Sequence, residues 1–85
     1  MVQTARMGYE VHVLVTLTKP PGEALMTALD HQFEVASHTA GTKTVTLAEH
    51  VSIDDEQDAI GFVRSLVQDA IPDGAKITEI SATPD

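Results

Sequence analysis

The sequence predicts a small α+β domain, and three observations lead to this prediction. The stretch Tyr9–Thr18 alternates apolar, largely β-branched residues with mostly polar ones, which is the pattern of a half-buried β-strand. The stretch from about Asp54 to Ile71 repeats apolar residues at helical spacing. Proline and glycine clusters at 19–22 and 72–74 interrupt the chain, so strands and helices are expected to alternate along it.

The first strand is expected to end where prolines enter the sequence. Pro20 and Pro21 cannot donate to a β ladder, and Gly22 relaxes the backbone at the turn. A helix is then expected from Glu23 to about His31, because its leucines and one alanine share a face. At two to three turns this helix must be held by packing, since isolated helices of that length are marginal.

A β-hairpin is predicted after this helix. Residues 33–38 and 44–48 both alternate, and Gly41 suits the left-handed position of a short loop formed by Ala40, Gly41 and Thr42. The register that keeps apolar residues together pairs Val35 with Leu47 and Ser37 with Val45 on one face, and Ala36 with Thr46 and His38 with Thr44 on the other.

The second helix has the clearest sequence signal. Ser52 or Asp54 is expected to cap it, and the acidic residues that follow suit its first turn. The turn at 72–74 ends the helix, since proline removes a backbone donor. Its buried stripe is expected to consist of Ala59, Ile60, Val63, Leu66, Val67, Ala70 and Ile71.

The last strand is predicted over Lys76–Ala82. Ile77 and Ile80 do not share a face of a regular strand, which suits an edge strand with both sides partly covered. The element order is therefore β-α-β-β-α-β in one domain, residues 9–85, after a flexible tail, residues 1–8.

Right-handed crossovers turn this order into a ferredoxin-like two-layer sandwich. The expected sheet is four-stranded and antiparallel, with strand order 4-1-3-2 and both helices on one face. We further expect the first and third strands to lie side by side and parallel at its centre. Function does not follow from this architecture, because it hosts many unrelated activities.

Composition narrows the function classes. Thirteen acidic and five basic residues give a net charge of −8, which makes nucleic acid an unexpected partner. A basic protein partner, or mimicry of nucleic acid, stays open beside plain solubility. The chain has no cysteine, so disulfides and thiolate metal sites are excluded and a cytoplasmic location is expected. No apolar run approaches the length of a membrane span, and residues 1–8 lack the apolar core of a secretory signal.

The segment Val13–Leu29, VLVTLTKPPGEALMTAL, resembles the opening of an ACT-type regulatory domain. Such domains have a first strand, a loop that ends in Pro-Gly, and a helix that begins with small and apolar residues. The resemblance implies a small-molecule sensor, often for an amino acid, with the ligand near Lys19, Pro21 and Gly22, commonly where two copies join their sheets. The chain departs from the pattern where Lys19 and Pro20 replace the acidic residue that many such domains carry.

Histidine is the residue type to examine for metal binding or pH sensing. His12 and His38 are both expected on the sheet face opposite the helices, where they would flank Thr44, with His50 at the other end of that face near Thr18. Two histidines without an assured third ligand do not make a metal site, so we expect no metal and no cofactor. Solvent-exposed histidines and a pH-sensitive interface both stay open.

Enzyme motifs are missing from the chain. It has no cysteine nucleophile, no glycine-rich phosphate cradle and no Gly-x-Ser-x-Gly elbow. Glu10 and Glu34 could do acid–base chemistry only if they lay close together and partly buried. The acids at 54–58 suit a helix start and lack the spacing of a calcium loop. RNA binding is not expected either, since the open face of the central strands has no aromatic residue to stack bases. We therefore do not expect an enzyme.

The uncovered sheet face is the main candidate for function. Leu14, Thr16, Thr46 and Ala48 are expected to form a flat, mildly apolar surface there, which a second copy or another protein could cover. An ordinary solvent-facing sheet is the plain alternative. The sequence thus predicts a small non-enzymatic domain that acts through protein contacts, with self-association first and ACT-like ligand sensing as the alternative.

Overall fold

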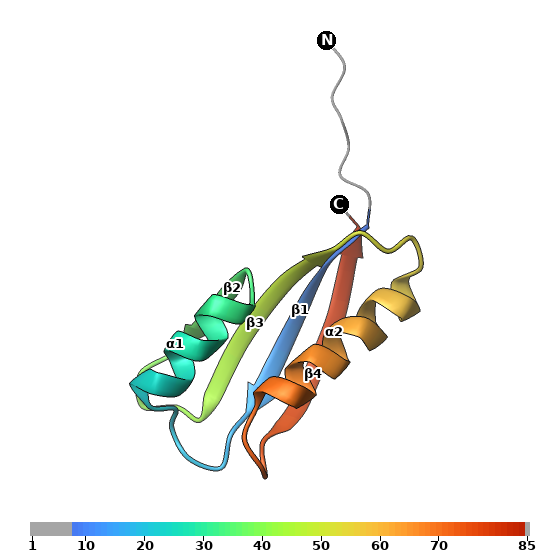
Figure 1. The fold of residues 1–85 in the computed structure, drawn as a ribbon. Helices are drawn as coiled ribbons and strands as arrows, with labels where there is room; N and C mark the ends of the chain where they lie inside the picture. Colours follow the sequence, from blue (N-terminus) through green and yellow to red (C-terminus); the bar gives the residue numbers. More distant parts are fainter. Residues whose placement is uncertain (1–7, 85) are drawn as a thin grey trace.

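The computed structural model describes residues 8–84, so the predicted tail lies outside the described residues except for Gly8. The elements are β1 (Tyr9–Thr16), α1 (Glu23–Gln32), β2 (Val35–His38), β3 (Thr44–Val51), α2 (Glu56–Ala70) and β4 (Lys76–Pro84). The sheet order is β2-β3-β1-β4, which confirms the predicted two-layer α+β sandwich with order 4-1-3-2 read from the other edge. Figure 1 shows both helices on the same side of the sheet, with α1 over β2 and α2 over β4.

Strand β1 lies in the middle of the molecule and is antiparallel to both of its neighbours, β3 and β4. The prediction that the first and third strands run parallel was wrong. The crossover through α1 returns the chain so that β2 runs in the direction of β1, and the hairpin then reverses β3. Residues of β1 and β3 therefore pair in opposite order, with Thr16 beside Thr44 and Tyr9 beside Val51.

The core lies between the sheet and the helices. Val11, Val13 and Val15 of β1 are at most 1% exposed, because every second residue of the strand faces the helix layer. The remaining buried apolar residues of this cluster are Leu17, Leu29, Phe33, Val45, Leu47, Val51, Ala59, Val63 and Val67. The predicted stripe of α2 is thereby confirmed, since its residues are either buried or packed against this cluster, apart from Ile60, which is half-buried.

The hairpin pairs one residue out of the predicted register. The observed pairs are Val35 with Ala48, Ala36 with Leu47, Ser37 with Thr46 and His38 with Val45. The turn is one residue longer than expected: Thr42 N–H donates to the Thr39 carbonyl (3.1 Å), and Gly41 has the predicted left-handed conformation, at φ +83°. Phe33 is buried at the end of α1 and fills the core just before β2, so the small Ala36 faces the helix layer and Val35 faces away from it.

A β-bulge in β4 puts two isoleucines on one face. The register shifts between Leu14 and Val15, so that Ile80 pairs with Val13 while Ile77 pairs with Val15. Both isoleucines pack against the core although they are three residues apart, and the expectation that they occupy different faces was wrong. The extra residue, Thr78, donates its hydroxyl to the Leu14 carbonyl (3.1 Å).

The two helices begin differently. Asp55 caps α2 by accepting the Asp58 N–H at Oδ1 (2.9 Å), so neither Ser52 nor Asp54 is the cap that the sequence suggested. Gly22 precedes α1 and offers no side-chain cap. Asp55 directly precedes the helix, and a carboxylate at that position can accept a hydrogen bond from the backbone N–H of the third helical residue, Asp58.

Two glycines should respond in opposite ways to a methyl group. Gly8 has φ +110°, and a Cβ there would overlap the carbonyl oxygen of Val51, so Gly8→Ala is expected to destabilise the fold by about 1–3 kcal/mol. Gly61 lies inside α2 with open space around it, so Gly61→Ala should stabilise by about 1 kcal/mol. Urea unfolding of both variants measures this, and equal effects would contradict the assigned backbone.

The N-terminal cap of α2 can be tested with a matched pair of variants. Asp55→Ala is expected to lower the free energy of unfolding by about 1 kcal/mol, because the Asp58 N–H loses its acceptor. Asp54→Ala removes the neighbouring charge but no cap and should change stability by less than about 0.5 kcal/mol. Thermal unfolding of the two variants distinguishes them; a larger loss in Asp54→Ala would assign the cap to Asp54.

Candidate functional site

The sheet face opposite the helices, here called the open face, is the first candidate site. The four residues predicted for it come together there: Leu14 and Thr16 alternate with the buried valines of β1, and Thr46 and Ala48 alternate with the buried residues of β3. Leu14 is the direct cross-strand partner of Thr46. No helix among residues 8–84 covers this face (Figure 1).

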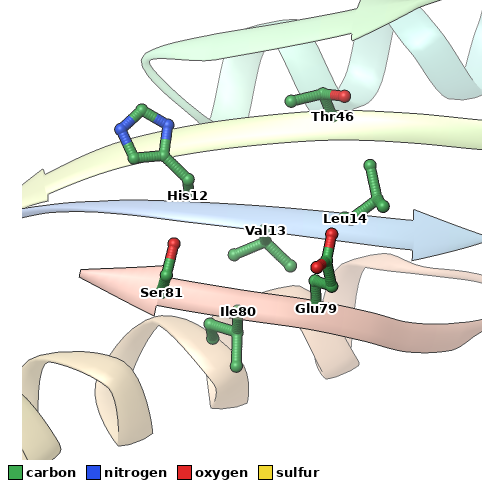
Figure 2. Close-up of a pocket in the computed structure, with 7 residues that line it drawn as sticks. All are labelled: His12, Val13, Leu14, Thr46, Glu79, Ile80 and Ser81. Atoms are coloured by element: carbon green, nitrogen blue, oxygen red, sulfur yellow. The ribbon is translucent and has the colours of Figure 1, made fainter. Parts of the chain in front are cut away.

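A shallow hollow of about 390 Å³ lies on the open face between β1 and β4; we call it the sheet hollow. Figure 2 shows His12 and Glu79 near opposite ends of it, with Leu14 beside Glu79 and Ser81 below His12. His12 and Ser81 are cross-strand partners, as are Leu14 and Glu79. Glu79 and Ser81 were not predicted from the sequence, because the face of β4 depends on the bulge at Thr78.

The corrected hairpin register adds Val35 to the open face and removes Ala36 and His38 from it. Val35 is 45% exposed and lies opposite Ala48, which is itself only 5% exposed. Ala36 and His38, which were expected on this face, lie on the helix side opposite Leu47 and Val45. Leu14, Val35 and Ala48 therefore form the apolar part of the open face.

Charge is unevenly divided between the two faces of the molecule. The pairing register places two carboxylates, Glu10 and Glu79, on the open face together with His12, His50 and Lys76. Most of the acidic residues lie in or close to the helices: Glu23, Asp30, Asp54, Asp55, Glu56, Asp58, Asp69 and Asp73. The open face is thus close to neutral, while the helix layer is strongly acidic.

The histidines do not assemble into a metal site. His12 lies on the open face, whereas His38 faces the helix side and its Nε2 lies 2.7 Å from the Thr42 carbonyl oxygen, so these two weak candidates are on opposite faces. His50 lies opposite Glu10, and Thr44 lies opposite Thr16, so neither arrangement expected from parallel strands occurs. Within residues 8–84 there is no group of three or more side chains able to hold a metal ion.

The carboxylate pair considered for catalysis is also separated. Glu10 lies on the open face opposite His50. Glu34 precedes β2, and its backbone N–H donates to Glu49 Oε1 (2.7 Å). Glu34 lies outside the sheet, so it does not join Glu10 on the open face as a neighbouring strand residue.

The loop after β1 forms the second candidate site. Lys19, Pro21 and Gly22, named by the ACT-like resemblance, line a hollow of about 500 Å³, here called the loop hollow. The turn after α2 completes it with Pro72 and Asp73. The remaining lining residues are Leu17, Thr18, Pro20 and Leu25.

Two loops far apart in sequence meet closely at the loop hollow. Gly74 has φ +87°, and a Cβ there would lie 2.8 Å from the Thr18 side chain. The hollow has mostly apolar walls and two opposite charges, Lys19 and Asp73. Asp73 was not predicted from the sequence, although the antiparallel pairing of β1 and β4 puts both loops at one end of the sheet.

The fold and these two hollows define the class of the protein as a two-layer α+β sandwich with an open sheet face. Comparisons with family models, with curated proteins and with solved structures gave no match for this chain. Neither helix in the described part of the chain has the length and hydrophobicity needed to cross a membrane.

Proposed function

We propose that this chain is a small non-enzymatic domain that acts through protein contacts and associates with a second copy through its open face. The observation that supports this proposal most strongly is that helices cover one face of the sheet and leave the other uncovered. One face is covered by helices, and the other presents Leu14 and Val35 on a nearly neutral surface. The lack of cysteine supports a reducing compartment, so we include a cytoplasmic location in the proposal.

Charge favours a second copy on this face over the other possible approaches. Two copies that meet through their helix layers would bring acidic surfaces together, which repel. Two copies that meet through their open faces hold those layers roughly 30 Å apart, since packed layers lie about 10 Å from each other. That separation exceeds the screening length of about 8–10 Å at physiological salt, so the net charge of −8 does little to oppose this dimer.

The size of the face indicates a weak dimer. Three strands of eight or nine residues and one of four, about 4.8 Å apart, cover roughly 460 Å² in each copy. Two copies then bury on the order of 1,000 Å², which is the lower limit for a specific interface. The proposed dimer therefore dissociates on dilution and is not a permanent one.

Leu14 is the residue to change first, because it is the largest apolar side chain on the central strand of the open face. Leu14→Lys is expected to give a folded monomer and to weaken dimerisation at least about tenfold, since the ammonium loses water in the interface. Phe62→Lys is the matched control, because Phe62 is an apolar residue of the helix layer that is 51% exposed.

Sedimentation velocity at several concentrations measures the association of both variants, and circular dichroism measures their fold. A wild-type chain that stays monomeric at all concentrations contradicts the proposal. So does a Leu14→Lys variant that associates as strongly as the Phe62→Lys control.

A specific observation also favours the second candidate, ACT-like sensing of a small molecule. The loop hollow combines apolar walls with Lys19 and Asp73, and these opposite charges suit the carboxylate and the ammonium group of an amino acid. An α-amino acid with an apolar side chain is the ligand class that this lining fits best. The same hollow is the place that the family resemblance implies.

Thermal unfolding against a panel of amino acids tests this second candidate. A ligand present at about a hundred times its dissociation constant stabilises the fold by about 2.7 kcal/mol, a shift of about ten degrees or more in a domain of this size. Gly22→Val should abolish the shift and keep the fold, because Gly22 has φ −84° and its Cβ position is open. A shift that survives in Gly22→Val would place the ligand elsewhere, and no shift with any amino acid would refute sensing of this class.

A further inference from the structure

We infer that the dimer has its two-fold axis over Leu14 and Ser81, so that His12 of each copy binds Glu79 of the other. This inference rests on the proposed self-association and specifies its geometry. The two residues are exposed and lie on neighbouring strands, near opposite ends of the sheet hollow (Figure 2).

The pairing register supplies the geometry. His12 and Ser81 form one cross-strand pair and Leu14 and Glu79 the next pair on the same face, so the four residues mark the corners of a rectangle. Its sides are about 6.8 Å along the strand and about 4.8 Å across it. One diagonal joins Leu14 to Ser81, and the other joins His12 to Glu79. A two-fold axis along the first diagonal therefore exchanges the two ends of the second, to within about 3 Å.

Other axes through this part of the face leave charges poorly matched. An axis along the His12–Glu79 diagonal would set each of these residues against its own copy, and two carboxylates would face each other. An axis along β1 would again bring His12 onto His12. Of these three axes, the one over Leu14 and Ser81 gives an imidazole N–H, which histidine carries in either protonation state, a carboxylate acceptor.

The same axis also suits the uncharged residues of the open face. Leu14 lies on the axis and meets Leu14 of the other copy, which buries apolar surface at the centre of the interface. Thr16 and Thr46 lie on either side of the axis further along, so the two threonines of opposite copies come together. The strands of the two sheets would cross at about 70°, which is near the orthogonal class of sheet packing.

Mixing two single variants tests the contact between copies. His12→Glu sets two carboxylates against each other in its homodimer, and Glu79→Lys removes the acceptor from its own. When the two are mixed, the carboxylate introduced in one chain meets the ammonium group introduced in the other, and the second contact keeps its wild-type residues. Native mass spectrometry of an equal mixture of one ¹⁵N-labelled and one unlabelled variant should show a ratio of heterodimer to total homodimer at least about threefold above the statistical ratio of one to one.

A control variant distinguishes the effect of the His12–Glu79 contact from a general effect of net charge. Thr83→Glu adds the same charge to an exposed position of β4 on the open face that lies roughly 11 Å from residue 79 of the other copy in this arrangement, so its mixture with Glu79→Lys should stay close to statistical. A statistical mixture of His12→Glu with Glu79→Lys, or an equal excess in the control, would overturn the His12–Glu79 contact while a dimeric wild type keeps the proposed function. A monomeric wild type would overturn both.

Discussion

The one-sided burial of β1 is the constraint on which the rest of the structure depends. This strand pairs with β3 at one edge and β4 at the other, and its valines Val11, Val13 and Val15 hold both helices on the same face. Because side chains alternate along a strand, the same residues that build the core force His12 and Leu14 onto the opposite face. The fold therefore creates the surface through which we propose that the protein acts.

The distribution of charge favours association through the open face. A small domain with a net charge of −8 would repel its own copies if the acids were evenly spread. Here they gather around α1 and α2, where they suit the positive ends of helices at Glu23, Glu56 and Asp58. The open face keeps a balance of carboxylates and basic groups. One arrangement of charge thus favours both helix formation and approach through the sheet.

Sequence periodicity was enough to predict the elements and their order, because strand alternation and the helical spacing of apolar residues are both local and strong signals. The alternation that begins at Tyr9 and the helical stripe that ends near Ala70 each allow one interpretation, and right-handed crossovers then leave few sheet orders. These same patterns put Leu14, Thr16, Thr46 and Ala48 on one face correctly. The loop residues Lys19, Pro21 and Gly22, named by the ACT-like resemblance, line a single hollow.

Features decided by a single residue could not be predicted in this way. The hairpin register depends on how Phe33 fills the core ahead of β2, and the face of β4 depends on a bulge at Thr78. A shift of one residue moves every side chain to the other face, so Val35 and Glu79 were missed and His38 was misplaced. Both errors concern edge strands, where fewer neighbours fix the register.

The most direct test of the central claim is a dilution series of the wild-type protein followed through its backbone amide chemical shifts. Over about 1 μM to 1 mM, the range in which an interface of this size dissociates, we predict concentration-dependent shifts around Leu14, Thr46 and Ser81. Amides around Phe62 in the helix layer should stay unchanged. Shifts confined to the helix layer, or none over the whole range, would contradict association through the open face.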